Sequence, residues 1–192
     1  MYDRDRTIVH LLPTGVEGPV TLRDGTAVFV RAAQPWDAAA VAAFAAGLSP
    51  DALELRFFSA ARPEAVSHEA LLEGAVGDRL SLLALHEKPI GMEVVGHGEY
   101  VRTAPHRASA EVAFLVADRF RHRGLATVLL HRLARAARLF GIREFEAEVL
   151  PENADMLDVF RRSGFPERVE SASGGTHVRF SITEEPTPIP EA

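Results

Sequence analysis

Short apolar segments with the period of β-strands recur along the chain before and after one long helical stretch. In these segments apolar residues alternate with polar ones or run continuously, and Gly, Pro or Asp separates many of them. The predicted strands cover residues 20–23, 27–32, 80–86, 91–103, 107–117, 144–149, 165–171 and 176–182. Asp24-Gly25 predicts a tight turn between the first two. The continuous apolar run at 112–116 is typical of a strand that is covered on both faces.

The apolar period lengthens to that of an amphipathic helix between Gly124 and Phe140. Leu125, Leu129 and Leu133 fall on one stripe, and the arginines of the segment fall largely outside it. Further helices are predicted over residues 35–48, from 50 onward, over 68–75, and after the N-cap residue Asn153. This succession of strands and helices predicts an α/β protein with a mixed sheet and several helices packed on it.

The length of the chain, 192 residues, fits a single domain with one core. We expect a flexible leader over residues 1–18, the folded domain over 19–183, and a disordered, proline-rich tail over 184–192. The longest apolar run, residues 38–48, is too short to cross a bilayer, and the N-terminus does not resemble a signal peptide. The expectation is a soluble, cytoplasmic protein without a membrane partner.

Composition narrows the chemistry that the chain can carry. It contains no cysteine, which excludes disulfides, thiolate metal sites and a cysteine nucleophile. The formal net charge of -6 argues against a nucleic-acid partner and is compatible with a cationic substrate such as an amine. The histidines do not recur at metal-ligand spacing, and the Gly-x-Ser-x-Gly nucleophile motif is absent. We therefore predict neither a metal nor a covalent nucleophile.

An arginine-rich turn joins the strand ending at Ala117 to the helix that starts at Gly124. The first amides of a helix have no partner within it and carry partial positive charge, so they can bind an anion. Gly124 lets a phosphate approach the backbone, and Arg119, Arg121 and Arg123 add positive charge. The Walker and dinucleotide-binding patterns are both absent. Taken alone, the turn is equally compatible with a loop that merely joins a strand to a solvated helix.

Two motifs in sequence order give this turn a family context. Arg121-x-x-Gly124-x-Ala126 resembles the Gln/Arg-x-x-Gly-x-Gly/Ala signature of the GNAT acetyltransferase superfamily, and Phe160-x-x-x-Gly164-Phe165 resembles its Tyr-x-x-x-Gly-Phe segment. The order of strand, turn, helix, strand and capped helix over 108–166 also resembles the order of elements in that superfamily. Four further segments are similar to bacterial Pat-type protein lysine acetyltransferases. They are Leu22-Arg-Asp-Gly-Thr-x-Val-x-Val-Arg31, Leu48-Ser49-Pro50, Arg56-Phe57-Phe58 and Val149-Leu-Pro-Glu-Asn153-x-x-Met156-Leu157.

The resemblance implies a GNAT-like, mostly antiparallel mixed sheet, acetyl-CoA as the acyl donor, and a turn that binds the pyrophosphate of the coenzyme. Contacts to the coenzyme are implied for the strand before the turn, for the turn itself and for the later helix. These residues are Leu115, Val116, Arg121, His122, Arg123, Gly124, Leu125, Ala126, Thr127, Asn153 and Phe160. A helix cap alone would also explain Asn153, and a place in the core would explain Phe160.

Glu111 is the predicted general base. A free lysine has a pKa of about 10.4, so its ammonium must lose a proton before the amine can attack a thioester. Related enzymes place a glutamate at the start of this strand; the alternative is a strand-end residue that faces solvent. Glu148, at the end of the neighbouring strand, is the second catalytic candidate. Alternation puts Glu144 and Glu146 on the same face as Glu148, where they are interpreted as a solvated edge.

The Pat resemblance implies direct acetyl transfer to a lysine of a protein substrate such as an acyl-CoA synthetase. Two other functions stay open. One is acetylation of a small-molecule amine or peptide N-terminus, because the family shares its coenzyme-binding part, whereas the part that binds the acceptor is poorly specified by sequence. The other is a non-catalytic coenzyme A-binding module, because many relatives have a proton-donating tyrosine where this chain has Phe160.

Overall fold

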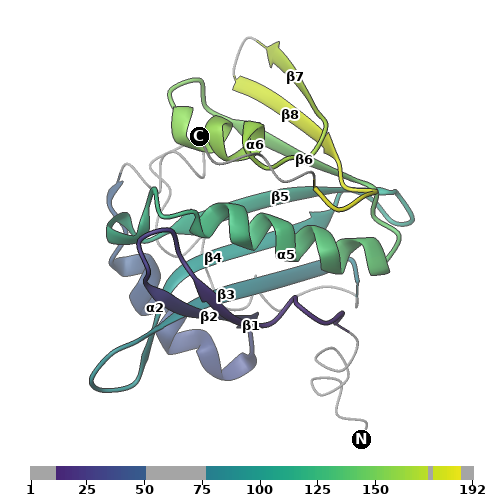
Figure 1. Cartoon of the computed structure of the whole chain (residues 1–192). Coiled ribbons are helices and arrows are strands. Elements are labelled where there is room, and N and C mark those ends of the chain that lie inside the picture. The colour runs from purple at the N-terminus through teal and green to yellow at the C-terminus, as the bar shows by residue number, and fades with distance from the viewer. Residues whose placement is uncertain (1–11, 51–76, 173–174, 187–192) are drawn as a thin grey trace, which may run out of the picture.

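Eight strands of the described chain form one continuous twisted sheet in the order β1-β2-β3-β4-β5-β6-β8-β7 (Figure 1). The computed structural model describes residues 12–50, 77–172 and 175–186. The strands are β1 Gly18–Thr21, β2 Ala27–Ala32, β3 Arg79–Glu87, β4 Met92–Arg102, β5 Ser109–Val116, β6 Glu144–Val149, β7 Glu167–Ala172 and β8 Gly175–Ser181. The described helices are α2 Ala38–Ala46, α5 Leu125–Leu139 and α6 Ala154–Arg161, with 3-10 turns η1 Pro35–Asp37 and η3 Asp118–Phe120.

Neighbouring strands of this sheet are antiparallel except for β5 and β6, which are parallel and joined through α5. The β5–β6 pairing covers only three positions, from Ser109↔Glu144 to Glu111↔Glu146. Beyond Glu111 the two strands continue without pairing, so they diverge. In Figure 1, β6, β7 and β8 accordingly tilt away from β1–β5. The mixed, mostly antiparallel sheet flanked by helices confirms the predicted fold class.

The largest part of the core lies between the sheet and α5, on the face that α6 also covers. Leu125, Leu129 and Leu133 are almost fully buried, which confirms the predicted stripe. Glycines on β4 let the helix come close to the sheet: a Cβ on Gly96 would lie 2.9 Å from Leu125 Cδ2, and one on Gly98 would lie 3.2 Å from Leu129 Cβ. The helix that starts at the arginine-rich turn is therefore fixed closely against the sheet.

The opposite face of the sheet is covered in part by α2. Val41 and Phe44 pack there against a second cluster that includes Leu83, Leu85 and Leu115. The predicted helix over 35–48 is confirmed as η1 followed by α2. The helices predicted from residue 50 onward and over 68–75 lie outside the described residues.

The described part of the expected leader, residues 12–18, is packed rather than loosely held. Val16 is fully buried in the core. The Arg132 guanidinium of α5 donates to the Val16 and Gly18 carbonyls at 3.1 and 3.0 Å, and the Ala32 amide donates to Glu17 Oε1 at 2.8 Å. The ordered domain therefore begins before residue 19. The short sequence pattern around Val16 gave no sign of this because Arg132, which donates to its carbonyl, is 116 residues away along the chain.

Candidate active site

A cavity of about 560 Å³ opens where β5 and β6 diverge. Its walls are β5 from Glu111 to Val116, the end of β6, the first turn of α5, and α6. Both predicted carboxylates and all but one of the predicted coenzyme residues line it. These lining residues are Glu111, Leu115, Val116, Arg121, His122, Gly124, Leu125, Ala126, Thr127, Glu148, Asn153 and Phe160. Arg123 is not among the lining residues.

The turn before α5 brings the start of that helix to the wall of the cavity. His122 and Gly124 have left-handed backbones, with φ of 59° and 86°, and the helix begins at Leu125. Its first backbone hydrogen bond runs from the Val128 amide to the Gly124 carbonyl at 3.1 Å. The amides of residues 125–127 therefore have no acceptor inside the helix, and all three residues line the cavity. The positive end of the α5 dipole is available to an anion there.

Two arginines of the turn hold it to the rest of the fold. The Arg123 guanidinium lies 2.7 Å from Asp24 Oδ2, donates to Thr26 Oγ1 at 3.2 Å and stacks over the Phe120 ring. The hydrogen bond from the Thr26 amide, helped by the Thr26 hydroxyl and Arg123, lowers the pKa of Asp24 below its ordinary value. Arg119 pairs with Glu93 of β4. These charges therefore anchor the turn to two hairpins, a role that the sequence did not distinguish from phosphate binding.

Arg121 is the arginine of the turn that lines the cavity. Its guanidinium lies 2.8 Å from Asp155 Oδ2 in the first turn of α6, and His122 Nε2 lies 3.6 Å from the same oxygen. Asp155 also lines the cavity. The ion pair thus joins the two helix starts across the wall that they share. Sequence reasoning did not single out Asp155, because nothing in its local pattern relates it to Arg121.

The start of α6 contributes the predicted cap. Asn153 is 8% exposed, and its Oδ1 accepts a hydrogen bond from the Met156 amide at 3.1 Å, which confirms it as the N-cap. Its contact with the coenzyme stays a prediction. Phe160 is 2% exposed and packs between Phe114 and Phe180, with ring centroids 6.4 and 5.2 Å away. It is both a core residue and part of the cavity wall, and it carries no hydroxyl group.

Glu111 and Glu148 reach the cavity from the sheet face opposite α5. Their neighbours Ala110, Val112, Ala147 and Val149 are buried in the α5-side core, so alternation turns the glutamates the other way. Both side chains are exposed, and neither makes a hydrogen bond or ion pair in the part of the chain that the structure describes. Each can therefore meet a substrate group without first breaking a contact with another described residue.

The cavity, the turn and the strand divergence agree with the match of residues 51–165 to the acetyltransferase (GNAT) family. The chain belongs to this family. It is also 30% identical over 146 residues to acetyltransferase Pat of Mycolicibacterium smegmatis, an alignment that covers 76% of this chain. The chain spans 43% of the length of that relative.

Solved structures agree with the sequence comparison. The GNAT domain of S. lividans PAT superposes with a TM-score of 0.75 at 34% identity, covering 88% of this chain and 98% of that domain. Mycobacterium smegmatis RimJ, solved in complex with CoA-disulfide, has a TM-score of 0.64 at 22% identity, covering 86% of this chain and 85% of RimJ. The predicted resemblance to GNAT and Pat-type acetyltransferases is confirmed. None of the described helices is long and apolar enough to span a bilayer.

Proposed function

We propose that this chain is an acetyl-CoA-dependent N-acetyltransferase that modifies a lysine side chain of a protein. The single observation that carries the proposal is the cavity between β5 and β6, which has free helix amides on its wall and an exposed glutamate, Glu111, among its lining residues. An acyl-CoA and an amine need these two environments within one site.

The described residues fit coenzyme A. The amides of residues 125–127 and the dipole of α5 suit a pyrophosphate, and Gly124 leaves the backbone open to it. Apolar side chains of the same cavity, including Leu115 and Phe160, suit the less polar arm of the coenzyme. A related fold, RimJ, was solved with CoA-disulfide. When bound, the acyl-CoA supplies the thioester that is cleaved.

Glu111 would take the proton from the acceptor ammonium, directly or through water. This proton must leave because the protonated amine has no lone pair with which to attack. Glu148 lies on the same face and lines the same cavity, so it is the second carboxylate that can stabilise the incoming cation. Phe160 cannot protonate the departing thiolate.

A protein lysine is the acceptor that the relationship to Pat favours, with an acyl-CoA synthetase as one candidate. We also propose that the protein is cytoplasmic and that its reaction uses no metal ion.

The test is to incubate the purified chain with acetyl-CoA and a lysine-bearing acyl-CoA synthetase, and to map acetylated residues by mass spectrometry while thiol release is recorded. We expect both signals, and we expect Glu111→Gln to remove both. Turnover on small amines but on no protein would contradict the lysine assignment. Tight acetyl-CoA binding without turnover on proteins, peptides or amines would contradict the enzyme assignment.

A further inference from the structure

One line of paired residues crosses four strands next to the cavity. Glu111 of β5 pairs with Glu146 of β6, Glu146 pairs with Arg179 of β8, and Arg179 pairs with Arg168 of β7. Paired residues of a sheet point to the same face. Since Phe145 and the two neighbours of Arg179 are buried in the α5-side core, this face is the one opposite α5. We call these four residues the charged row.

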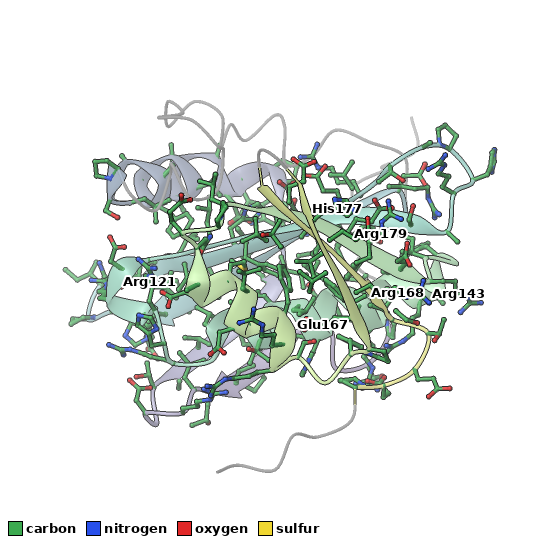
Figure 2. The ribbon with its side chains drawn as sticks, turned by 90° about the horizontal axis from the view of Figure 1, so that it is seen from above. Arg121, Arg143, Glu167, Arg168, His177 and Arg179 are labelled. Carbon is green, nitrogen blue, oxygen red and sulfur yellow. The ribbon has the colours of Figure 1, made fainter. Side chains whose placement is uncertain are left out.

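The charged row has two negative residues at one end and two positive residues at the other. Its middle is internally paired: Arg179 Nε lies 3.8 Å from Glu146 Oε2 and donates to His177 Nε2 at 3.0 Å, while His177 lies 3.5 Å from Glu146. Figure 2 shows His177 and Arg179 together on one side of β8, with Glu167 on the other side. The two ends are different, because the side chains of Glu111 and Arg168 are exposed and make no hydrogen bond or ion pair with the described residues.

The spacing of the row matches a short extended peptide. Neighbouring strands lie about 4.8 Å apart, so Arg179 and Arg168 are roughly 10 and 14 Å from Glu111 along the sheet. An extended chain advances about 3.3 Å per residue, so these spans correspond to about three and four residues. Side chains of an extended chain alternate in direction, so the fourth residue along points to the same side as the first. An ammonium at Glu111 and a carboxylate four residues away, at Arg168, would therefore each meet an opposite charge.

We propose that the charged row is the acceptor-docking surface, and that it fits an extended segment of a protein with an acidic residue four positions from the target lysine. This inference rests on the proposed function and adds a substrate class to it. The acidic end alone would attract any cation. The exposed Arg168 supplies the discrimination, because it repels a segment that is basic throughout and attracts one that carries a carboxylate.

The experiment uses peptides with one central lysine and one variable residue placed four positions before or after it. Glu, Gln and Lys are compared at each position, with acetyl-CoA saturating, and acetylation of the central lysine is quantified separately from that of any other lysine by tandem mass spectrometry. At low ionic strength we expect kcat/KM for the best Glu peptide to exceed that of its Gln counterpart by about threefold or more, with the Lys peptide the poorest. At about 0.5 M salt the preference should largely disappear.

Charge reversal of the exposed end makes the test specific. Arg168→Glu should invert the preference, so that the Lys peptide becomes better than the Glu peptide, and Arg168→Gln should abolish it. Arg135→Glu is the matched control, because Arg135 is an exposed arginine on α5, which covers the other face of the sheet. The control should keep the wild-type preference.

Two failures are distinguishable. Lysine acetylation with equal kcat/KM for Glu, Gln and Lys peptides, or a preference unchanged in Arg168→Glu, would overturn the docking surface and leave the proposed function intact. Absence of acetylation on every peptide and protein would overturn the proposed function, and the docking surface with it.

Discussion

The turn before α5 and the charged row meet the same cavity, yet they are built from different parts of the chain. The turn exposes backbone amides of consecutive residues. A left-handed glycine and side chains that pair with other parts of the fold, such as Arg123 with Asp24, hold these amides in place. The charged row exposes side chains from four strands, none consecutive in sequence. A site made of backbone depends on local geometry, whereas a surface made of side chains depends on which residues stand at four separate positions.

The turn and the charged row should therefore differ in how well they tolerate substitutions. Amides at a helix start keep their direction when most side chains change, so the anion site should tolerate variation except where the backbone itself needs glycine. The exposed end of the charged row, Arg168, can change sign without breaking a side-chain contact among the described residues, because its side chain faces away from the α5-side core. Acceptor preference should therefore vary more readily than coenzyme binding.

Glu111→Gln should have the largest effect and should separate the two regions. The amide keeps the shape but cannot accept a proton, so kcat for a lysine peptide should fall by about 10²–10⁴-fold. The dissociation constant for acetyl-CoA, measured by calorimetry, should stay within about twofold, since that site is formed by the turn. Glu144→Gln, on the same face of β6 but outside the cavity lining, is the control and should keep its activity. Full activity of Glu111→Gln would remove Glu111 from the mechanism.

Gly124→Ala should damage the turn and leave the charged row intact. The backbone φ of 86° is strained for alanine, and the added Cβ would lie 3.3 Å from Arg23 Nε. A cost of about 1–2 kcal/mol at this position corresponds to roughly 5–30-fold weaker binding of acetyl-CoA. Gly25→Ala is a matched control, because Gly25 has nearly the same φ of 85° with nothing within 4 Å of an added Cβ. Equal effects of the two variants on binding would show that the loss is general strain.

Glu146→Gln should affect the acceptor and spare the coenzyme. It removes one of two paired carboxylates from the acidic end of the row and takes away the ion-pair partner of Arg179, so the row becomes more positive beside Glu111. We expect KM for a lysine peptide to rise by about three- to tenfold at low salt, with little change in kcat. The same measurement at high salt should show a smaller difference. An unchanged KM at low salt would show that the acidic end of the row does not extend beyond Glu111.

Asp155→Asn should have the smallest effect and should act on the turn alone. The substitution releases Arg121 from its 2.8 Å ion pair and removes a negative charge from the cavity lining. Acetyl-CoA should then bind about two- to threefold more tightly. Asp158→Asn is the control on the same helix, since Asp158 also lines the cavity but pairs with Arg162 of its own helix turn. Weaker binding in Asp155→Asn would mean that the ion pair supports the site instead of competing with the phosphate.

Much of the fold was predictable from local patterns. The strand segments, the stripe on α5 and the cap at Asn153 depend on periods and short motifs that each lie within one element. The roles of the arginines in the turn could not be predicted from such local patterns. Arg119, Arg121 and Arg123 look alike in sequence, yet only Arg121 lines the cavity, because the partners of the other two come from distant hairpins.

The sequence by itself predicted a helix start that can bind an anion and indicated the family of the chain, because both rest on a contiguous stretch whose backbone geometry is local. It also determined that Glu144, Glu146 and Glu148 share a face, since alternation within one strand requires it. Only the tertiary structure decided that Glu146 stands between Glu111 and Arg179. Strand order and register come from packing between distant segments, and no period within a strand records which strand lies beside it.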